Sequence, residues 1–292
     1  MKTRTFLILL FALVSTVVSS VVLFLSTNKV ALLNPKGPVA QQQFELLKFA
    51  VSLSLFVLIP VLVLAFFIAW KYREKSSEAA EGQTPNLQGN KVVVTIFWLI
   101  PIAIISILAI ITWQATHNID PYKPLNSNKE PLTIQVVALQ WKWLFIYPEQ
   151  DIATVNFVQF PEQTPIRFKL TADAPMNSFW IPQLGGQIYA MPGMETQLNL
   201  LANSTGEFAG SAAEISGPGF AGMKFVAKSS TEYEFQKWVE TVQESGNILT
   251  IDEYADLAEP SENNQVAYYS WQEGLFESIL NKYSSNNYMQ YQ

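Results

Sequence analysis

The stretch SAAEISGPGFAGM, residues 211–223, has the shape of a metal-binding loop, because small side chains surround a Gly-Pro-Gly turn and Met223 closes it. Protein copper sites use cysteine, histidine and methionine as their ligands. Of these the stretch contains only Met223, which alone would be a weak axial ligand. Ala212, Ser216 and Phe220 offer a methyl group, an alcohol and a benzene ring, and none of these can hold a copper ion. The stretch therefore predicts the form of a copper loop without its ligands.

The composition excludes several kinds of chemistry. The chain of 292 residues has no cysteine and one histidine, His117, so disulfides, thiolate sites and sites with two imidazoles cannot form within it. The net charge is −6 and no long basic run occurs, which disfavours nucleic acid as a partner. No G-x-S-x-G motif is present, which disfavours a hydrolase. His117 lies just past an apolar run, and we interpret it as an interfacial hydrogen-bonding residue rather than a ligand.

Hydrophobic residues make up 49% of the chain and charged residues only 14%, a balance typical of membrane proteins. Three apolar runs contain no charge; they lie between Arg4 and Lys29, between Lys48 and Lys71, and between Lys91 and Asp120. Each has at least the ~20 residues that a helix needs to cross a bilayer. We predict three transmembrane helices, the second and third of which contain Pro60 and Pro101.

Basic residues at the N-terminal tip and in the loop 71–91 place both segments on the cytoplasmic side, which puts everything after about residue 118 on the outer side. The first run could instead be a signal peptide. Its apolar part is long for that role and no clear A-x-A site follows it, so we favour an uncleaved first span.

The period of the pattern changes to two from residue 131, where short runs rich in Val, Ile, Phe and Thr alternate between turn residues up to about residue 228. This predicts a small antiparallel sandwich or barrel. Helical spacing then follows, with capping pairs Ser229–Glu232 and Thr250–Glu253. We predict four parts, a first span or signal anchor at 1–28, a two-span hairpin at 29–119, a β domain at 120–228 and a C-terminal helical region at 229–292.

Several strings together resemble subunit II of the haem-copper terminal oxidases, most closely the quinol-oxidising branch of the cytochrome bo type. They are ALLNPKG, FWLIP, QWKWLFIYPEQDIATVNFVQFP, MNSFWIPQLGGQIYAMPGM and SGPGFAGMKF, and the resemblance covers residues 30 to 283. It implies that the β domain is cupredoxin-like.

The cytochrome-c-oxidising branch of this family holds a dinuclear copper in two loops of that domain. The resemblance places its histidine positions at Asn177 and Phe220 and its cysteine positions at Ala212 and Ser216. The glutamate and methionine positions match Glu214 and Met223. Four of the six positions thus lack a copper ligand, which implies a copper loop kept as a scaffold.

By resemblance, the chain is a structural subunit of a quinol oxidase that passes electrons from quinol to oxygen and translocates protons. The chain itself would carry no cofactor, and haem and copper would lie in the partner subunit I. Further small membrane subunits, quinol and the lipid bilayer would be its other partners, in the bacterial inner membrane with the C-terminal domain on the periplasmic side. Two alternatives are a copper-bearing cytochrome c oxidase subunit, which the missing ligands disfavour, and a free-standing membrane-anchored binding module.

A strand over QWKWLFIY would place Trp141, Trp143, Phe145 and Tyr147 on one face. Core and interface packing is the interpretation we favour for these aromatic side chains. The alternative, by resemblance, is a tryptophan through which electrons enter. The family also commonly has a glutamate near a proton channel in the third span, where this chain has Val94, so that role would fall to another carboxylate.

Overall fold

The computed structural model describes residues 30–71, 91–262, 264–271 and 274–283, with four isolated residues (16, 19, 20 and 23) of the first apolar run. The predictions for the first span and for the loop 72–90 therefore fall outside the described residues, as do the last nine residues of the predicted C-terminal region. The chain divides into two compact units. One contains the residues up to Phe44 and those from Pro121 onward, and the other is Glu45–Asp120.

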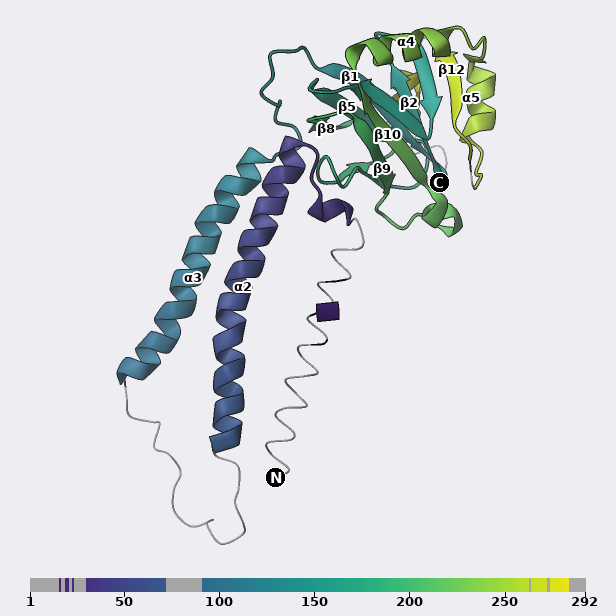
Figure 1. The fold of residues 1–292 in the computed structure, drawn as a ribbon. Helices are drawn as coiled ribbons and strands as arrows, with labels where there is room; N and C mark the ends of the chain where they lie inside the picture. The colour runs from purple at the N-terminus through teal and green to yellow at the C-terminus, as the bar shows by residue number, and fades with distance from the viewer. Residues whose placement is uncertain are drawn as a thin grey trace. The chain divides into compact units, whose positions relative to one another are not determined.

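Two helices, α2 (Pro38–Lys71) and α3 (Lys91–Asn118), follow the second and third apolar runs (Figure 1). Among the described residues these are the two helices long and apolar enough to cross a membrane. Hydroxyl groups inside them donate to the carbonyl four residues earlier, as Ser54 does to Ala50 and Ser106 to Ile102, both at 2.8 Å. This bonding satisfies the polar side chains within their own helix, as an apolar surrounding requires.

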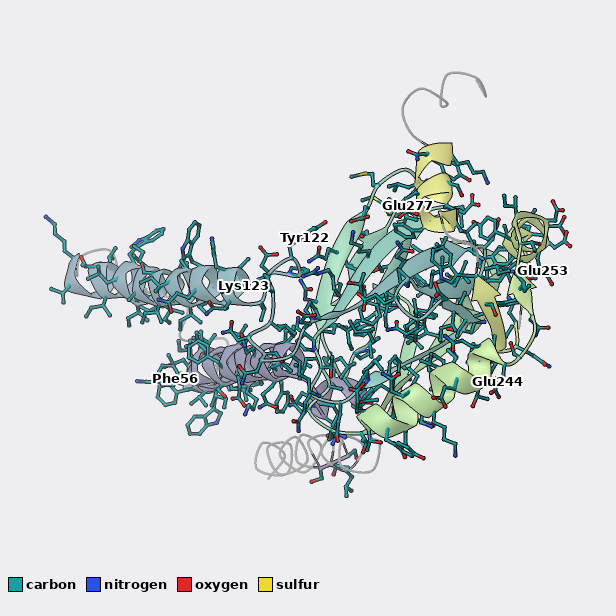
Figure 2. All side chains as sticks on the ribbon, turned by 90° about the horizontal axis from the view of Figure 1, so that it is seen from above. Phe56, Tyr122, Lys123, Glu244, Glu253 and Glu277 are labelled. Atoms are coloured by element: carbon teal, nitrogen blue, oxygen red, sulfur yellow. The ribbon has the colours of Figure 1, made fainter. Side chains whose placement is uncertain are left out.

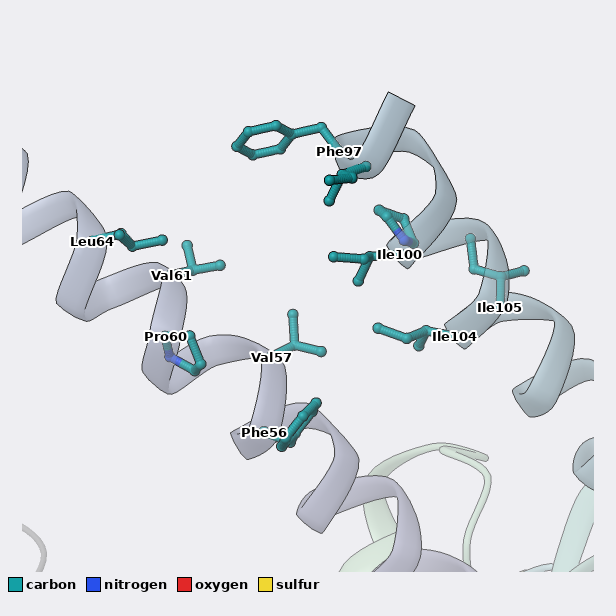
Figure 3. A pocket seen from close by; sticks show the side chains of 11 residues that line it. Phe56, Val57, Pro60, Val61, Leu64, Phe97, Ile100, Ile104 and Ile105 are labelled. Carbon is teal, nitrogen blue, oxygen red and sulfur yellow. The ribbon is translucent and has the colours of Figure 1, made fainter. Parts of the chain in front are cut away.

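Both helices contain a proline, and the two prolines line the same cavity between α2 and α3 (Figure 3). Pro60 and Pro101 have no N–H to donate, which leaves the carbonyls of Phe56 and Phe97 without their usual helical partners. The cavity measures about 530 Å³ and its lining is entirely apolar.

The β domain consists of two packed sheets. The seven-stranded sheet has the order β11-β12-β3-β2-β1-β5-β8. Its strands are β1 (Leu132–Leu139), β2 (Lys142–Tyr147), β3 (Ile152–Val155), β5 (Ile166–Ala172), β8 (Thr196–Leu200), β11 (Ile248–Leu249) and β12 (Ala267–Trp271). The five-stranded sheet has the order β4-β10-β9-β6-β7. Its strands are β4 (Phe157–Pro161), β6 (Asn177–Trp180), β7 (Ile188–Ala190), β9 (Gly206–Ala212) and β10 (Lys224–Ser230).

The alternating pattern of the sequence becomes the core between the sheets. Ile134, Val136 and Ala138 of β1 point into it with none of their surface exposed. Phe179 and Phe225, both on the five-stranded sheet, stack on its inner face with ring centres 5.0 Å apart, and Trp143 of the other sheet lies 5.3 Å from Phe179. The predicted β sandwich is therefore confirmed, and its layers can be followed in Figure 1.

Two details of the predicted sheet are wrong. The sandwich is mixed rather than antiparallel, because β1 pairs in parallel with β5, β4 with β10, and β11 with β12. These pairs join strands separated by long connections, which period-two patterns do not reveal. The predicted strand over QWKWLFIY begins only at Lys142, because Trp141, whose φ is +69°, lies in the tight turn that separates β1 from β2.

The segment before α2 is tied to the β domain. Lys36 N donates to Gln183 O at 2.7 Å, and Asn203 N donates to Lys36 O at 2.8 Å. Gly37 is packed so closely that a Cβ there would lie 2.3 Å from the Leu201 carbonyl oxygen. The segment ALLNPKG thus packs against the connections at Leu184 and Leu201, and only glycine fits at position 37.

The C-terminal region forms the helices α4 (Glu232–Gln243), α5 (Ile251–Ala258) and α6 (Leu275–Lys282). The predicted cap of α5 at Thr250 is confirmed by its bond from Glu253 N. The predicted capping pair Ser229–Glu232 is wrong. The capping box is formed by Thr231 and Glu234, two residues later, because β10 continues through Ser229 and Ser230.

The region after residue 229 is more than helical, because it adds two strands to the seven-stranded sheet. β12 pairs antiparallel with β3, and β11 pairs with β12. α4 contributes Phe235, Val239 and Val242 to the core of the sandwich. The residues predicted as β domain and as C-terminal region thus belong to one compact unit.

Candidate functional site

The 211–223 loop connects β9 to β10 and contains a short 3₁₀ helix, Pro218–Gly222. Its two ends are joined by a hydrogen bond from Ala212 N to Met223 O at 3.0 Å. Ala213 N donates to Ser178 O at 2.8 Å, which ties the loop to β6. Met223 is fully buried in the core. Backbone bonds and packing hold this loop closed.

The loop also rests on Trp141. The indole Nε1 donates to Ser216 O at 3.2 Å. A Cβ at Gly219 would lie 2.3 Å from Trp141 Cδ2, and one at Gly217 would lie 3.1 Å from its Cζ2. The indole ring therefore packs directly on the glycine backbone of the Gly-Pro-Gly turn, which any larger residue would push away. This pairing was not predicted from the sequence, in which the two segments lie about 75 residues apart.

Asn177 is the first residue of β6 and is 1% exposed. Its Nδ2 donates to Pro175 O at 3.0 Å. Its Oδ1, like the Oγ of Ser216, is buried with no hydrogen-bond partner among the described residues. Buried oxygens of this kind are commonly satisfied by ordered water.

The residues at the six positions do not fit a dinuclear copper centre. Ala212 and Phe220 have no donor atom, and Phe220 instead packs against the hydrophobic core. Asn177 and Ser216 present an amide oxygen and a hydroxyl, which suit hard cations rather than copper. Across the described part of the chain, no group of three or more His, Cys, Asp or Glu side chains could hold a metal.

The aromatic side chains of β2 are core residues. Trp143, Phe145 and Tyr147 have no exposed surface. The Trp143 ring lies 5.3 Å from the Phe179 ring, and the Phe145 ring lies 5.2 Å from the Phe225 ring. Their burial within the domain removes them as surface contacts. Trp141 is the one predicted interface residue whose side chain is partly exposed, and an interface role for it stays a prediction.

Tyr147 shows how a polar group is accommodated in this core. Its hydroxyl donates to Gln159 O and accepts from Gln159 N, both at 2.9 Å. Burial raises the pKa of the Tyr147 phenol, so the hydroxyl stays protonated and able to donate. The tyrosine therefore pins β2 to β4 across the sandwich.

Two further residues lie on α3. His117 forms a hydrogen bond between its Nδ1 and Trp113 O at 2.8 Å, and the two rings lie 4.5 Å apart. The bond lies within the helix, and an interfacial role for His117 stays a prediction. Val94 is exposed near the start of the helix.

Comparison with known proteins adds family evidence to this geometry. Residues 151–230 match the family model described as cytochrome c oxidase subunit II, periplasmic domain. Residues 243–287 match the COX aromatic rich motif. The first match contains Asn177 and the whole 211–223 loop.

Two curated relatives match almost the whole chain. The cytochrome bo(3) ubiquinol oxidase subunit 2 of Pseudomonas putida is 50% identical over 91% of this chain and 84% of its own length. The ubiquinol oxidase subunit 2 of Acetobacter aceti is 46% identical over 91% of this chain and 87% of its own length. Among solved structures, the periplasmic domain of subunit II of a cytochrome oxidase from Bradyrhizobium japonicum aligns at 25% identity, with a TM-score of 0.39. It covers 42% of this chain and 98% of that chain.

Proposed function

The chain belongs to the ubiquinol oxidase subunit 2 family, and from this premise we propose that it is the membrane-anchored subunit II of a respiratory quinol oxidase and carries no electrons itself. Its partner, subunit I, would hold the haems and copper, take electrons from quinol, reduce oxygen to water and translocate protons. This chain would hold and cover subunit I together with further small membrane subunits.

The observation that carries this proposal is the chemistry of the closed loop. Four of the six copper positions hold Asn177, Ala212, Ser216 and Phe220, and Trp141 packs against the turn between them. An electron relay from cytochrome c needs a redox group at this place, and these side chains offer none. Electrons would instead reach subunit I directly from a carrier dissolved in the membrane.

The helices and the family support a location in the inner membrane. α2 and α3 have the length and composition of membrane spans, and the matched family model is that of a periplasmic domain. We place the chain in the inner membrane, with the β domain on the periplasmic side.

The test is to tag the chain, extract it gently from its native membrane, and measure haem and copper per chain together with oxygen uptake. We expect co-purifying haem, one copper per complex, and oxygen uptake with quinol but not with reduced cytochrome c. Three coppers with cytochrome c activity would show that the loop binds metal after all. A chain that purifies without haem would support the free-standing module instead.

A further inference from the structure

The outer face of the seven-stranded sheet is apolar and is covered by the C-terminal elements. Val137 and Leu139 of β1, Leu144 and Ile146 of β2, and Val155 of β3 are all 1% exposed or less. We call β11, α5, β12 and α6 the C-terminal cover. It contributes Leu249, Tyr254, Leu275, Phe276 and Ile279 to this second cluster. Without the cover this face would be exposed to water.

The cover has little stability of its own. α5 and α6 have eight residues each, and isolated helices of that length are marginal in water. Glu253 of α5 lies on the outer surface, as does Glu244 just past α4 (Figure 2). The cover therefore depends on its contacts with the rest of the domain, which are the backbone pairing of β12 with β3, an apolar part and a polar part.

The polar part centres on one carboxylate. Asp173 follows β5, and its side chain is 2% exposed. Tyr254 Oη donates to its Oδ2 at 2.7 Å, and Lys282 Nζ donates to its Oδ1 at 2.8 Å. The hydroxyl of Tyr283 donates to Oδ1 as well. The Asp173 carboxylate thus accepts hydrogen bonds both from α5 and from the end of α6.

The end of α6 is also held sterically. Gly193, with φ +71°, lies so close to Tyr283 that a Cβ there would be 2.5 Å from its carbonyl oxygen. Asp173 N in turn donates to Ala138 O at 2.9 Å, which fixes the carboxylate to β1. Four residues after Asp173 comes Asn177, the first of the former copper positions. The connection from β5 to β6 therefore carries the anchor of the cover and leads directly into one side of the 211–223 site.

We propose that the C-terminal cover opens and closes as one unit over the outer sheet face. The hydrogen bonds to Asp173 hold it in the closed position. Opening breaks every bond to this carboxylate at once, because a buried charge left with only some of its partners is strongly unfavourable. β12 then leaves β3, and the cover separates from β1, β2 and β3 while the sandwich core, which has its own cluster of buried residues, stays folded.

The test is hydrogen exchange on the full-length chain in its purified complex, comparing wild type with Asp173→Asn and Tyr283→Phe. We expect amides of α5, β12 and α6 to exchange together about tenfold faster in Asp173→Asn, which removes the charge from all of the hydrogen bonds to this side chain. We expect about threefold faster exchange in Tyr283→Phe, which removes one of them. Amides of β9 and β10 should keep their wild-type rates.

The matched control is Glu195→Gln, which removes the surface ion pair with Lys169 at 3.2 Å. Lys169 lies on β5, the strand that Asp173 follows. This substitution should leave exchange in the cover unchanged. The proposal is overturned if cover amides in Asp173→Asn stay within about twofold of wild type, if α6 speeds up while β12 does not, or if the whole domain speeds up equally. Should Asp173→Asn fail to fold, Tyr283→Phe decides by the same criteria.

Discussion

At the scale of single residues, Trp141 is the side chain that gives the 211–223 loop its present form. Its positive φ is unusual for a bulky residue and turns the indole toward the loop rather than along a strand. The ring meets Gly219 at a distance that excludes a Cβ, and its N–H binds the Ser216 carbonyl. The shape of the ring and this hydrogen bond thus add to the backbone bonds that hold the loop.

Gly219→Ala should destabilise the β domain. The new methyl group would overlap the Trp141 ring, so either the ring or the loop must move, at a cost of about 2 kcal/mol. Urea unfolding of the purified chain in detergent, followed by tryptophan fluorescence, measures the change. Ala221→Ser, at an exposed position of the same loop, is the control. Equal midpoints for the two variants would show that the ring does not constrain the turn.

At the scale of elements, α4 depends on its first turn. Thr231 Oγ1 accepts from Glu234 N at 3.3 Å, and Glu234 Oε2 accepts from Thr231 N at 3.0 Å. Hydrogen bonds from the backbone N–H and side chain of Thr231 lower the pKa of Glu234. The helix begins two residues after the position that the sequence pattern indicated, because the pattern could not show where β10 ends.

Thr231→Ala should reduce the free energy of unfolding by about 1 kcal/mol, the usual effect of losing an N-cap. Thr241→Ala is the matched control in the same helix, since its exposed hydroxyl bonds only the Lys237 carbonyl four residues earlier. Its replacement should change stability little. Thermal unfolding of both variants measures the change. An equal loss of stability in both would show that the cap is not its cause.

Asp173 makes the stability of the domain depend on pH. Burial raises the pKa of this carboxyl, but hydrogen bonds from Lys282, Tyr283 and Tyr254 outweigh burial and hold the pKa below its usual value. A group with a depressed folded pKa stabilises the fold fully above its unfolded pKa of about 3.9 and loses that contribution as pH falls through the folded value.

We therefore expect the difference in unfolding free energy between wild type and Asp173→Asn to be constant between about pH 7 and about pH 5 and to shrink below about pH 4. Urea unfolding at several pH values measures it. Glu195→Gln, which changes an exposed pair, serves as the reference. A difference that grows on acidification would mean that Asp173 is protonated in the folded domain.

At the scale of the whole molecule, the two compact units differ in structure. The residues Glu45–Asp120 supply apolar helices whose hydroxyls are internally bonded, and the remaining unit supplies a folded domain built around two separate clusters of buried residues. A polar domain and an apolar anchor on one chain favour attachment of a folded domain to a membrane surface.

The absence of cysteine from the chain allows a direct topology measurement. Tyr233→Cys places a thiol at an exposed position of α4, and Ser77→Cys places one in the loop that follows the second apolar run. With intact spheroplasts and a membrane-impermeant maleimide, Tyr233→Cys should be labelled and Ser77→Cys should be labelled only after lysis. The reverse pattern would invert the proposed orientation.

Much of the fold could be predicted from local pattern. Uncharged runs of helical length predicted α2 and α3, alternation predicted the sandwich, and Thr250 predicted the start of α5. The residue types at Ala212, Ser216 and Phe220 were enough to argue against a copper site, because ligand chemistry belongs to the side chain itself. These properties depend on neighbours within a few residues.

The tertiary structure decided which distant residues meet. Nothing near Asp173 indicates that Tyr254, Lys282 and Tyr283 bind it from 81 to 110 positions away. Nor does local pattern show that Trp141 packs on Gly219 or that β12 joins β3. Periodicity indicates which face of an element is buried but not which other element covers that face. The covering element depends on how the long connections bring the strands together.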